Sequence, residues 1–429
     1  MNIEYPTTRD PQGSSLAKAQ TATDSSVANR IPPELQPYIL CHLDNASVAA
    51  CSLLSHHWRP HAQNHLLKEI TLIPTHRRNE NSLLEFLQSQ PRVCHIIRVL
   101  KVKNSSRVGN PGMEIPERMV SIDILSSILG VLPMLSALYI SRVDLISSRP
   151  FRSTVAPKSL DVVNLDSVVL GTISRRDNST HNFLSSFGTI SQLITQNVHV
   201  GVPPSRQTAN TIESSKTLDE LKICSATVLS STVDSPRGVM DTLQNYARTS
   251  LQSLKICYYG DLRYLGRLID AVSAQLVNLH LCIHLQTTSE NALIKPISLS
   301  RCVSLRTLGF TIPLPYRGWT SVTHDVSSAK CFDAMVEVLR SAPQTLTELT
   351  LKMSLSTSAD RSSEGVASLP WETLVQTGLH RLQHLEAFRV NFTRDYHDDR
   401  IVKDEYLDEV VCAKLTSWDR IDMLVFDSE

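Results

Sequence analysis

The sequence predicts a mixed α/β protein: a short helical module followed by an irregular repeat solenoid with a parallel sheet and helices on its convex side. Apolar residues recur at helical spacing in one segment near the amino terminus. One unit, apolar-x-x-apolar-x-apolar, then recurs through most of the 429-residue chain. We therefore expect a disordered tail over residues 1–29, the helical module over 30–72, a connecting helix or linker over 73–95, and the repeats over 96–429.

The composition excludes several classes of protein. Lysine and arginine number 42 and aspartate and glutamate also 42, so the chain lacks the basic excess typical of nucleic-acid binders. The nine cysteines include no CxxC pair, which favours reduced thiols inside the cell. The amino terminus has no apolar signal core, and Pro133 interrupts the most hydrophobic stretch, residues 122–140. We expect a cytoplasmic or nuclear protein that binds neither nucleic acid nor membrane.

The helical module is expected to begin at Ile31, because the two prolines that follow suit the first turn of a helix. Residues 1–29 hold almost no large apolar side chain, so they cannot offset the entropy lost on ordering. Ser47 is a suitable N-cap for a second short helix over Val48–Leu54. A third helix would carry Trp58 on its buried face.

The order of the proline-glutamate-leucine start, the small-residue second helix and Trp58 resembles an F-box over about a tenth of the chain. Ile31 departs from the pattern, in which leucine commonly begins the motif, and so do the two histidines before Trp58. In that family the module docks on a Skp-family adaptor, which joins it to a cullin scaffold and a ubiquitin-conjugating enzyme. The resemblance implies the following adaptor-facing or supporting positions: Ile31, Pro32, Leu35, Ile39, Leu40, Leu43, Leu53 and Trp58.

An alternative reading makes the same three helices an ordinary cap on the repeats. The apolar stripe of the first helix would then face inward and be covered by the repeats. A docking module instead leaves apolar side chains exposed, so exposed apolar surface distinguishes the two readings.

Ten matches to the repeat unit indicate strands that stack side by side and bury a continuous apolar ladder. They are Ile97/Leu100/Val102, Leu135/Leu138/Ile140, Leu160/Val163/Leu165, Leu218/Leu221/Ile223, Leu251/Leu254/Ile256, Leu276/Leu279/Leu281, Leu305/Leu308/Phe310, Leu346/Leu349/Leu351, Leu385/Phe388/Val390 and Ile421/Leu424/Phe426. The gap after the third match has room for an eleventh unit around Ile190–Leu193. Amphipathic patterns predict helices over 122–132, 239–247, 262–272, 331–339, 374–382 and 406–415.

This arrangement resembles a leucine-rich repeat protein without the asparagine ladder of that family. Four insertions rich in serine, threonine, glycine and proline are expected to be loops on the rim of the solenoid. They are 171–186, 201–215, 313–328 and 356–368. Such loops either determine specificity or are plain excursions of the chain.

Outward strand positions carry a mildly basic selection, set against Asp166 and Asp427. They are Lys101, Lys103, Lys222, Lys255, His280, Lys352 and Arg389. This selection predicts an acidic or phosphorylated protein target. The need for solubility accounts for it equally well.

No catalytic or metal-binding constellation is expected. His57, His61 and His65 share a helical face, but no carboxylate accompanies them, so we interpret them as a solvated surface. Cys224, Cys257 and Cys282 each follow the last apolar residue of a predicted strand, so they could form a thiol row on one face, and adjacent strands about 5 Å apart would make them ligands. We interpret them as tolerated surface thiols. GxSxG, GxxxxGK and GxGxxG are absent.

We therefore expect a non-catalytic receptor without a cofactor. It would be the substrate-recognition subunit of a Skp-cullin-F-box ubiquitin ligase, with its repeats binding an unknown protein target. The alternative is an adaptor-independent leucine-rich repeat scaffold for protein interactions.

Overall fold

The computed structural model describes residues 31–54, 56–74, 80–104, 119–147, 156–171, 179–200, 221–230, 235–258, 262–283, 297–314, 327–355, 364–393 and 405–426. The chain divides into two compact units, residues 1–68 and 69–429. The predicted tail over 1–29 and the predicted loop over 201–215 lie outside the described residues, as does Asp427.

Over its described residues, the first unit, here called the helical unit, consists of a 3-10 turn and three helices: η2 (Pro33–Leu35), α1 (Gln36–Leu40), α2 (Asn45–Leu54) and α3 (Trp58–Leu67). Its core is formed by the buried side chains of Leu40, Val48, Trp58 and Ala62. The predicted N-cap at Ser47 is wrong. The helix begins earlier, because the Ser47 backbone N–H donates to Asp44 Oδ1 at 2.7 Å.

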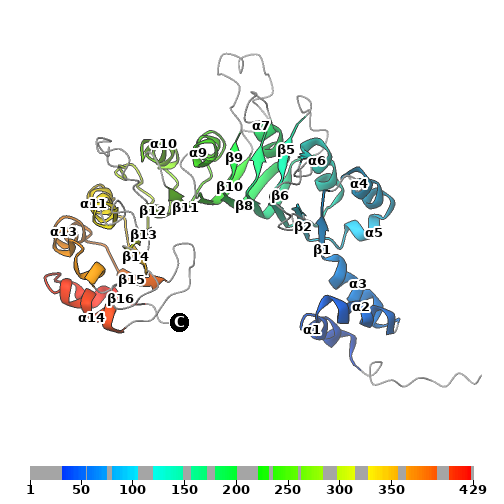
Figure 1. The fold of residues 1–429 in the computed structure, drawn as a ribbon, viewed down its shortest axis with the longest axis horizontal. Helices are drawn as coiled ribbons and strands as arrows, with labels where there is room; N and C mark the ends of the chain where they lie inside the picture. Colours follow the sequence, from blue (N-terminus) through cyan, green and yellow to red (C-terminus); the bar gives the residue numbers. More distant parts are fainter. Residues whose placement is uncertain are drawn as a thin grey trace, which may run out of the picture. The chain divides into compact units, whose positions relative to one another are not determined.

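The second unit, here called the sheet unit, contains a twelve-stranded parallel sheet whose strand order follows the chain (Figure 1). Its strands are β1 (Glu69–Leu72), β2 (Val99–Lys103), β4 (Ala137–Ser141), β6 (Lys158–Asp166), β8 (Phe187–Gln196), β10 (Lys222–Leu229), β11 (Ser253–Tyr258), β12 (Asn278–Ile283), β13 (Thr307–Pro313), β14 (Glu348–Ser354), β15 (Ala387–Thr393) and β16 (Leu424–Val425). The predicted combination of a helical segment with a parallel sheet and helices is thus present.

Helices connect these strands and lie along one side of them (Figure 1). They are α4 (Glu80–Ser89), α5 (Pro91–Cys94), α6 (Ile122–Val131), α7 (Ser179–Leu184), α9 (Ser235–Tyr246), α10 (Leu262–Val272), α11 (Ser327–Arg340), α13 (Trp371–Thr377), η4 (Leu379–Arg381), α14 (Glu405–Lys414) and η5 (Ile421–Met423). Each of the six predicted helical segments overlaps one of them. The predicted loop over 171–186 is partly wrong, because α7 occupies its second half and buries Phe183 and Leu184.

The boundary between the units falls after Lys68, four residues before the predicted end of the helical module. Strand β1 pairs in parallel with β2, so its residues belong to the sheet. The segment 73–95, expected to be a connecting helix or linker, contains α4 and α5. These helices bury Leu87 and Cys94 in the core of the sheet unit, so this segment is part of the sheet unit.

One apolar row crosses the sheet in perfect register and packs into the core. It is formed by Ile70, Leu100, Leu138, Val163, Leu193, Ala226, Leu254, Leu279, Leu308, Leu349, Phe388 and Leu424. The extra unit expected around Ile190–Leu193 is confirmed as strand β8. The unit expected at Leu218/Leu221/Ile223 is wrong in register: Ile223 pairs with Ile190, so Ala226 and Val228 take the strand positions.

A second parallel sheet of four short strands was not predicted. Its order is β3 (Met119–Ser121), β5 (Asp144–Ile146), β7 (Val169–Leu170) and β9 (His199–Val200). Arg142, Ser167 and Asn197 turn the chain into this sheet with φ values of 57°, 54° and 50°. Their backbone N–H groups donate to the last residue of the neighbouring strand, as Ser167 does to the Gln196 carbonyl at 2.7 Å. These hydrogen bonds between neighbouring strands hold the left-handed conformation, which arginine and serine rarely adopt.

Candidate functional site

Helix α1 and the residues that flank it present apolar side chains on two sides. Leu40 is 1% exposed and packs into the helical unit's core. Leu35, Ile39 and Leu43 are 50%, 36% and 36% exposed, and Tyr38 is 70% exposed. A spacing of three or four residues brings side chains onto one side of a helix. We call Leu35, Tyr38, Ile39 and Leu43 the α1 patch.

The chain entering α1 is fixed by local contacts. Pro32 is extended, and its carbonyl accepts a 3.0 Å hydrogen bond from the Leu35 backbone N–H, which closes the 3-10 turn. The buried Gln36 donates from Nε2 to the Ile31 carbonyl at 3.4 Å. Ile31 itself packs against the core. These contacts hold the start of α1 so that its outer side chains point into solvent.

The predicted adaptor positions therefore divide into two groups. Leu40 and Trp58 are buried and support the module, and Ile31 is half-buried against them. The exposed group is Pro32, Leu35, Ile39, Leu43 and Leu53, of which Leu53 is 80% exposed.

Tyr38 was missed by the sequence reasoning. It lies three residues after Leu35, so helical spacing is the signal that could have identified it. A patch of this kind on a small unit is typical of a surface that binds another protein.

The comparisons with known proteins were decisive for this segment. Residues 29–69 match the family model of the F-box domain. The helical unit is an F-box domain. F-box domains typically bind Skp-family adaptors and occur in Skp-cullin-F-box complexes. No curated protein matches the chain.

The match ends at residue 69, beside the boundary that the structure places after Lys68. The F-box and the helical unit thus coincide. Of the helices described, none combines the length and the apolar character needed to cross a membrane.

The second candidate surface is the side of the large sheet opposite its helices. Lys255 lies between the buried Leu254 and Ile256, so it points to that opposite side. Its register partners form what we call the central outward row. This row is Thr71, Lys101, Tyr139, Asn164, Ile194, Thr227, Lys255, His280, Gly309, Thr350, Arg389 and Val425.

The structure distributes the predicted target-binding residues over this side of the sheet. The central outward row contains Lys101, Lys255, His280 and Arg389. Two residues further along each strand, a second outward row contains Lys103 and Lys352. Lys222 is in neither row, because it pairs with Thr189 at the amino-terminal end of β10.

Two of the basic side chains in the central outward row already have acidic partners within the chain. Lys101 Nζ lies 2.5 Å from Glu69 Oε1, and Arg389 Nε lies 2.6 Å from Glu348 Oε1. Uncharged residues such as Tyr139 separate Lys101, the neighbouring Lys255 and His280, and Arg389 along the row. The row is therefore a mixed polar surface and not a continuous basic one.

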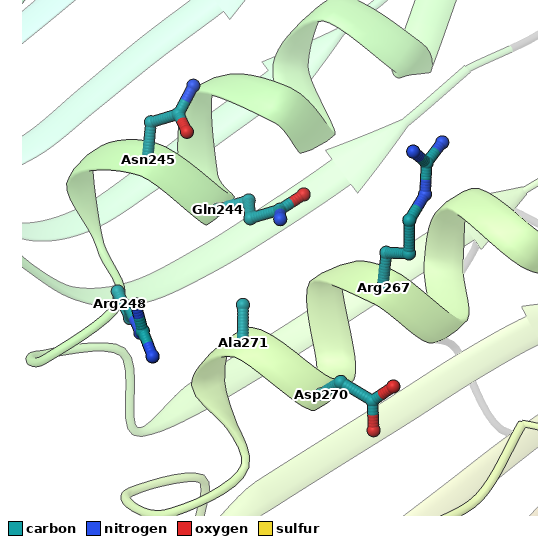
Figure 2. Close-up of a pocket in the computed structure, with 6 residues that line it drawn as sticks. All are labelled: Gln244, Asn245, Arg248, Arg267, Asp270 and Ala271. Atoms are coloured by element: carbon teal, nitrogen blue, oxygen red, sulfur yellow. The ribbon is translucent and has the colours of Figure 1, made fainter.

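The described part of the chain contains no group of three or more His, Cys, Asp or Glu side chains placed to hold a metal ion. This applies to His57, His61 and His65 of the F-box. A groove of about 470 Å³ between α9 and α10 is lined by Gln244, Asn245, Arg248, Arg267, Asp270 and Ala271. Figure 2 shows the guanidinium groups of Arg248 and Arg267 pointing in opposite directions, so they do not converge on one ligand.

Proposed function

We propose that the chain is the non-catalytic substrate-recognition subunit of a Skp-cullin-F-box ubiquitin ligase. The F-box would bind a Skp-family adaptor through the α1 patch and Leu53, and the adaptor would join it to a cullin. The sheet unit would bind a protein target. Transfer of ubiquitin would depend on the partner proteins.

The observation that carries this proposal is the exposure of the α1 patch beside a buried core. Leu35 and Ile39 are 50% and 36% exposed, and the core of the helical unit is formed by other side chains. Burying an apolar side chain of this size in an interface contributes about 1.5–3 kcal/mol. The patch is therefore a binding surface with enough apolar area to matter.

For the sheet unit we propose a degenerate leucine-rich repeat domain. Strand order that follows the chain, parallel pairing throughout, and one apolar row in register support it. Such stacks grow by adding units and leave an extended sheet side available for a partner. The central and second outward rows would receive the target, with their basic side chains, among them Lys103 and His280, facing its acidic or phosphorylated groups.

A pull-down tests the docking step. The double variant Leu35→Asp plus Ile39→Asp should fail to retain a purified Skp-family adaptor, because two carboxylates would be buried in an apolar interface. The circular dichroism spectrum and the unfolding transition of the sheet unit should be unchanged. Retention of the adaptor by the folded double variant would rule out this docking surface.

The alternative scaffold function makes a different prediction about deletion. If the helices served only to cap the repeats, removing residues 1–68 would lower the unfolding midpoint of the sheet unit. Under the proposal the midpoint stays within error of the full chain, because the helical unit has its own core.

A further inference from the structure

A cluster of two thiols, one imidazole and one hydroxyl lies on strands β11, β12 and β13 of the sheet unit. Cys257 and Cys282 are direct register partners on neighbouring strands, and Thr311 follows them on the next strand. All three belong to the second outward row. Their side chains therefore point to the same side of the sheet.

The geometry brings the two sulfurs together. Neighbouring strands lie about 4.8 Å apart, within the range of roughly 4.4–6.8 Å found between the Cα atoms of a disulfide. The structure records a side-chain hydrogen bond between Cys282 and Cys257. Both are thiols and are not joined in a disulfide. Cys224, expected in the same row, is not there, because Leu229 is the residue of β10 that pairs with Cys257.

His280 is held in place beside Cys282. Its Nε2 lies 2.8 Å from Thr311 Oγ1. Its ring lies over Gly309, where a Cβ atom would come within 2.1 Å of Nδ1. The imidazole also makes a hydrogen bond and a charge interaction with Cys282.

These contacts favour the thiolate of Cys282. The hydrogen bond from Cys257, followed by the hydrogen bond and charge of His280 and the hydrogen bond from Thr311, holds the pKa of Cys282 well below its ordinary value, although burial opposes this. The thiolate is the form that reacts with oxidants. Cys302 contrasts with it, because burial and then Asp270 raise its pKa to about 11.

We propose that Cys257 and Cys282 are an oxidation site that closes into a reducible disulfide between strands β11 and β12 when the protein meets hydrogen peroxide. The Cys282 thiolate attacks one peroxide oxygen; the S–O bond forms, the O–O bond breaks, and hydroxide leaves and is protonated to water. The Cys257 thiol then attacks the sulfenic acid of Cys282. The S–S bond forms, the S–O bond breaks, and the hydroxyl group leaves as water with the proton of Cys257.

In the net reaction, the two thiols lose two electrons in total and form the disulfide, and one hydrogen peroxide is reduced to two waters. Cys257 and Cys282 are 1% and 2% exposed, so the oxidant must be small. Bulky alkylating reagents should therefore react slowly with this pair in the folded protein.

Mass spectrometry of the full-length chain tests the proposal. The reduced protein is treated with hydrogen peroxide, denatured, alkylated and digested. We expect a linked peptide pair containing Cys257 and Cys282, lighter by two hydrogens and released by dithiothreitol, while Cys302 remains alkylated. The proposal is overturned if these two cysteines stay alkylated, if each is linked to another cysteine, or if Cys302 oxidises equally fast.

Variants test the order of the steps. Cys257→Ser should leave a sulfenic acid on Cys282 that a dimedone probe captures. His280→Asn should slow the linkage several-fold, whereas Cys224→Ser should leave its rate unchanged. If His280→Asn does not give the wild-type unfolding midpoint, the dimedone measurement on Cys257→Ser decides alone. Capture at residues other than Cys282 in that variant would contradict the assignment.

Discussion

Ile39 and Leu40 are consecutive residues of α1, but the Ile39 side chain is 36% exposed and that of Leu40 is 1% exposed. Successive residues of a helix point about 100° apart, which separates the two side chains. Leu40 packs with Val48, Trp58 and Ala62 to hold the F-box together. Ile39 belongs to the α1 patch. Folding and docking thus depend on different residues of the same helix, and variants can separate them.

The first prediction concerns the core of the F-box. Leu40→Ala should destabilise it by about 2–5 kcal/mol, because a buried leucine loses its contacts and leaves a cavity in a small unit. Leu53→Ala, at an 80% exposed position, should change stability by less than about 0.5 kcal/mol. Hydrogen exchange of residues 31–68 in the full chain measures both. Equal protection in the two variants would contradict the assignment of core and surface.

The second prediction compares two glycines of the sheet unit. Gly309→Ala should lower the unfolding free energy by about 1–3 kcal/mol, since the new Cβ would displace the His280 ring. Gly266→Ala should raise it by about 0.5–1 kcal/mol, because Gly266 lies within α10 and its Cβ would meet no atom within 4 Å. Urea unfolding followed by the fluorescence of the buried Trp371 and Trp418 reports both changes. A stabilising Gly309→Ala would show that the ring does not lie there.

The third prediction concerns pH. Burial lowers the pKa of His181 from its ordinary value of 6.5, and its Nδ1 lies 3.4 Å from the Tyr246 hydroxyl oxygen. Between the lowered pKa and 6.5 the unfolded chain binds a proton on His181 that the folded chain does not. The contribution of neutral His181 to the unfolding free energy is therefore fully present above pH 6.5, and it is lost as the pH falls from 6.5 to the lowered pKa.

His181→Phe removes that titration. The wild type should lose more unfolding free energy than His181→Phe when the pH is lowered from about 7.5 to about 5.5. Urea titrations at the two pH values measure the difference. An equal loss in both proteins would mean that His181 is protonated in the folded state.

Much of the fold followed from local patterns. The apolar spacing around Leu254 and Ile256, and the same spacing in most other units, predicted strands that the register confirms. Helical periodicity predicted α10 with the bounds observed, Leu262–Val272. Both patterns work because a buried side of a strand or helix must be apolar at a fixed period.

The predictions that failed concern features that depend on how neighbouring strands pair in the sheet. The register of β10 is determined by its pairing with β8, so Ala226, a small residue with a weak apolar signal, takes the core position that Leu221 seemed to fill. The second sheet has strands as short as Val169–Leu170, too short for a periodic pattern. The sequence put Cys224 in line with Cys257 and Cys282, but the register pairs Cys257 with Cys282 and places Leu229, not Cys224, on the other side of Cys257.

The site was predicted to a similar extent. Helical spacing identified most of the α1 patch, but it did not separate Ile39 from Leu40, because both are large aliphatic residues in a five-residue helix. Tyr38, which is 70% exposed, was not among the predicted positions. The basic positions Lys101 and Arg389 could not be recognised as ion-paired, because Glu69 and Glu348 come from neighbouring strands.

The central claim is that the α1 patch binds a Skp-family adaptor, and a titration of the purified adaptor against the full chain tests it most directly. Leu35→Asp plus Ile39→Asp should weaken binding by about 100-fold or more, since two buried apolar side chains contribute about 3 kcal/mol. Phe86→Asp, at a 50% exposed apolar position of α4 outside the F-box, is the matched control and should bind like the wild type. Wild-type affinity in the folded double variant, or equal weakening by Phe86→Asp, would contradict the account.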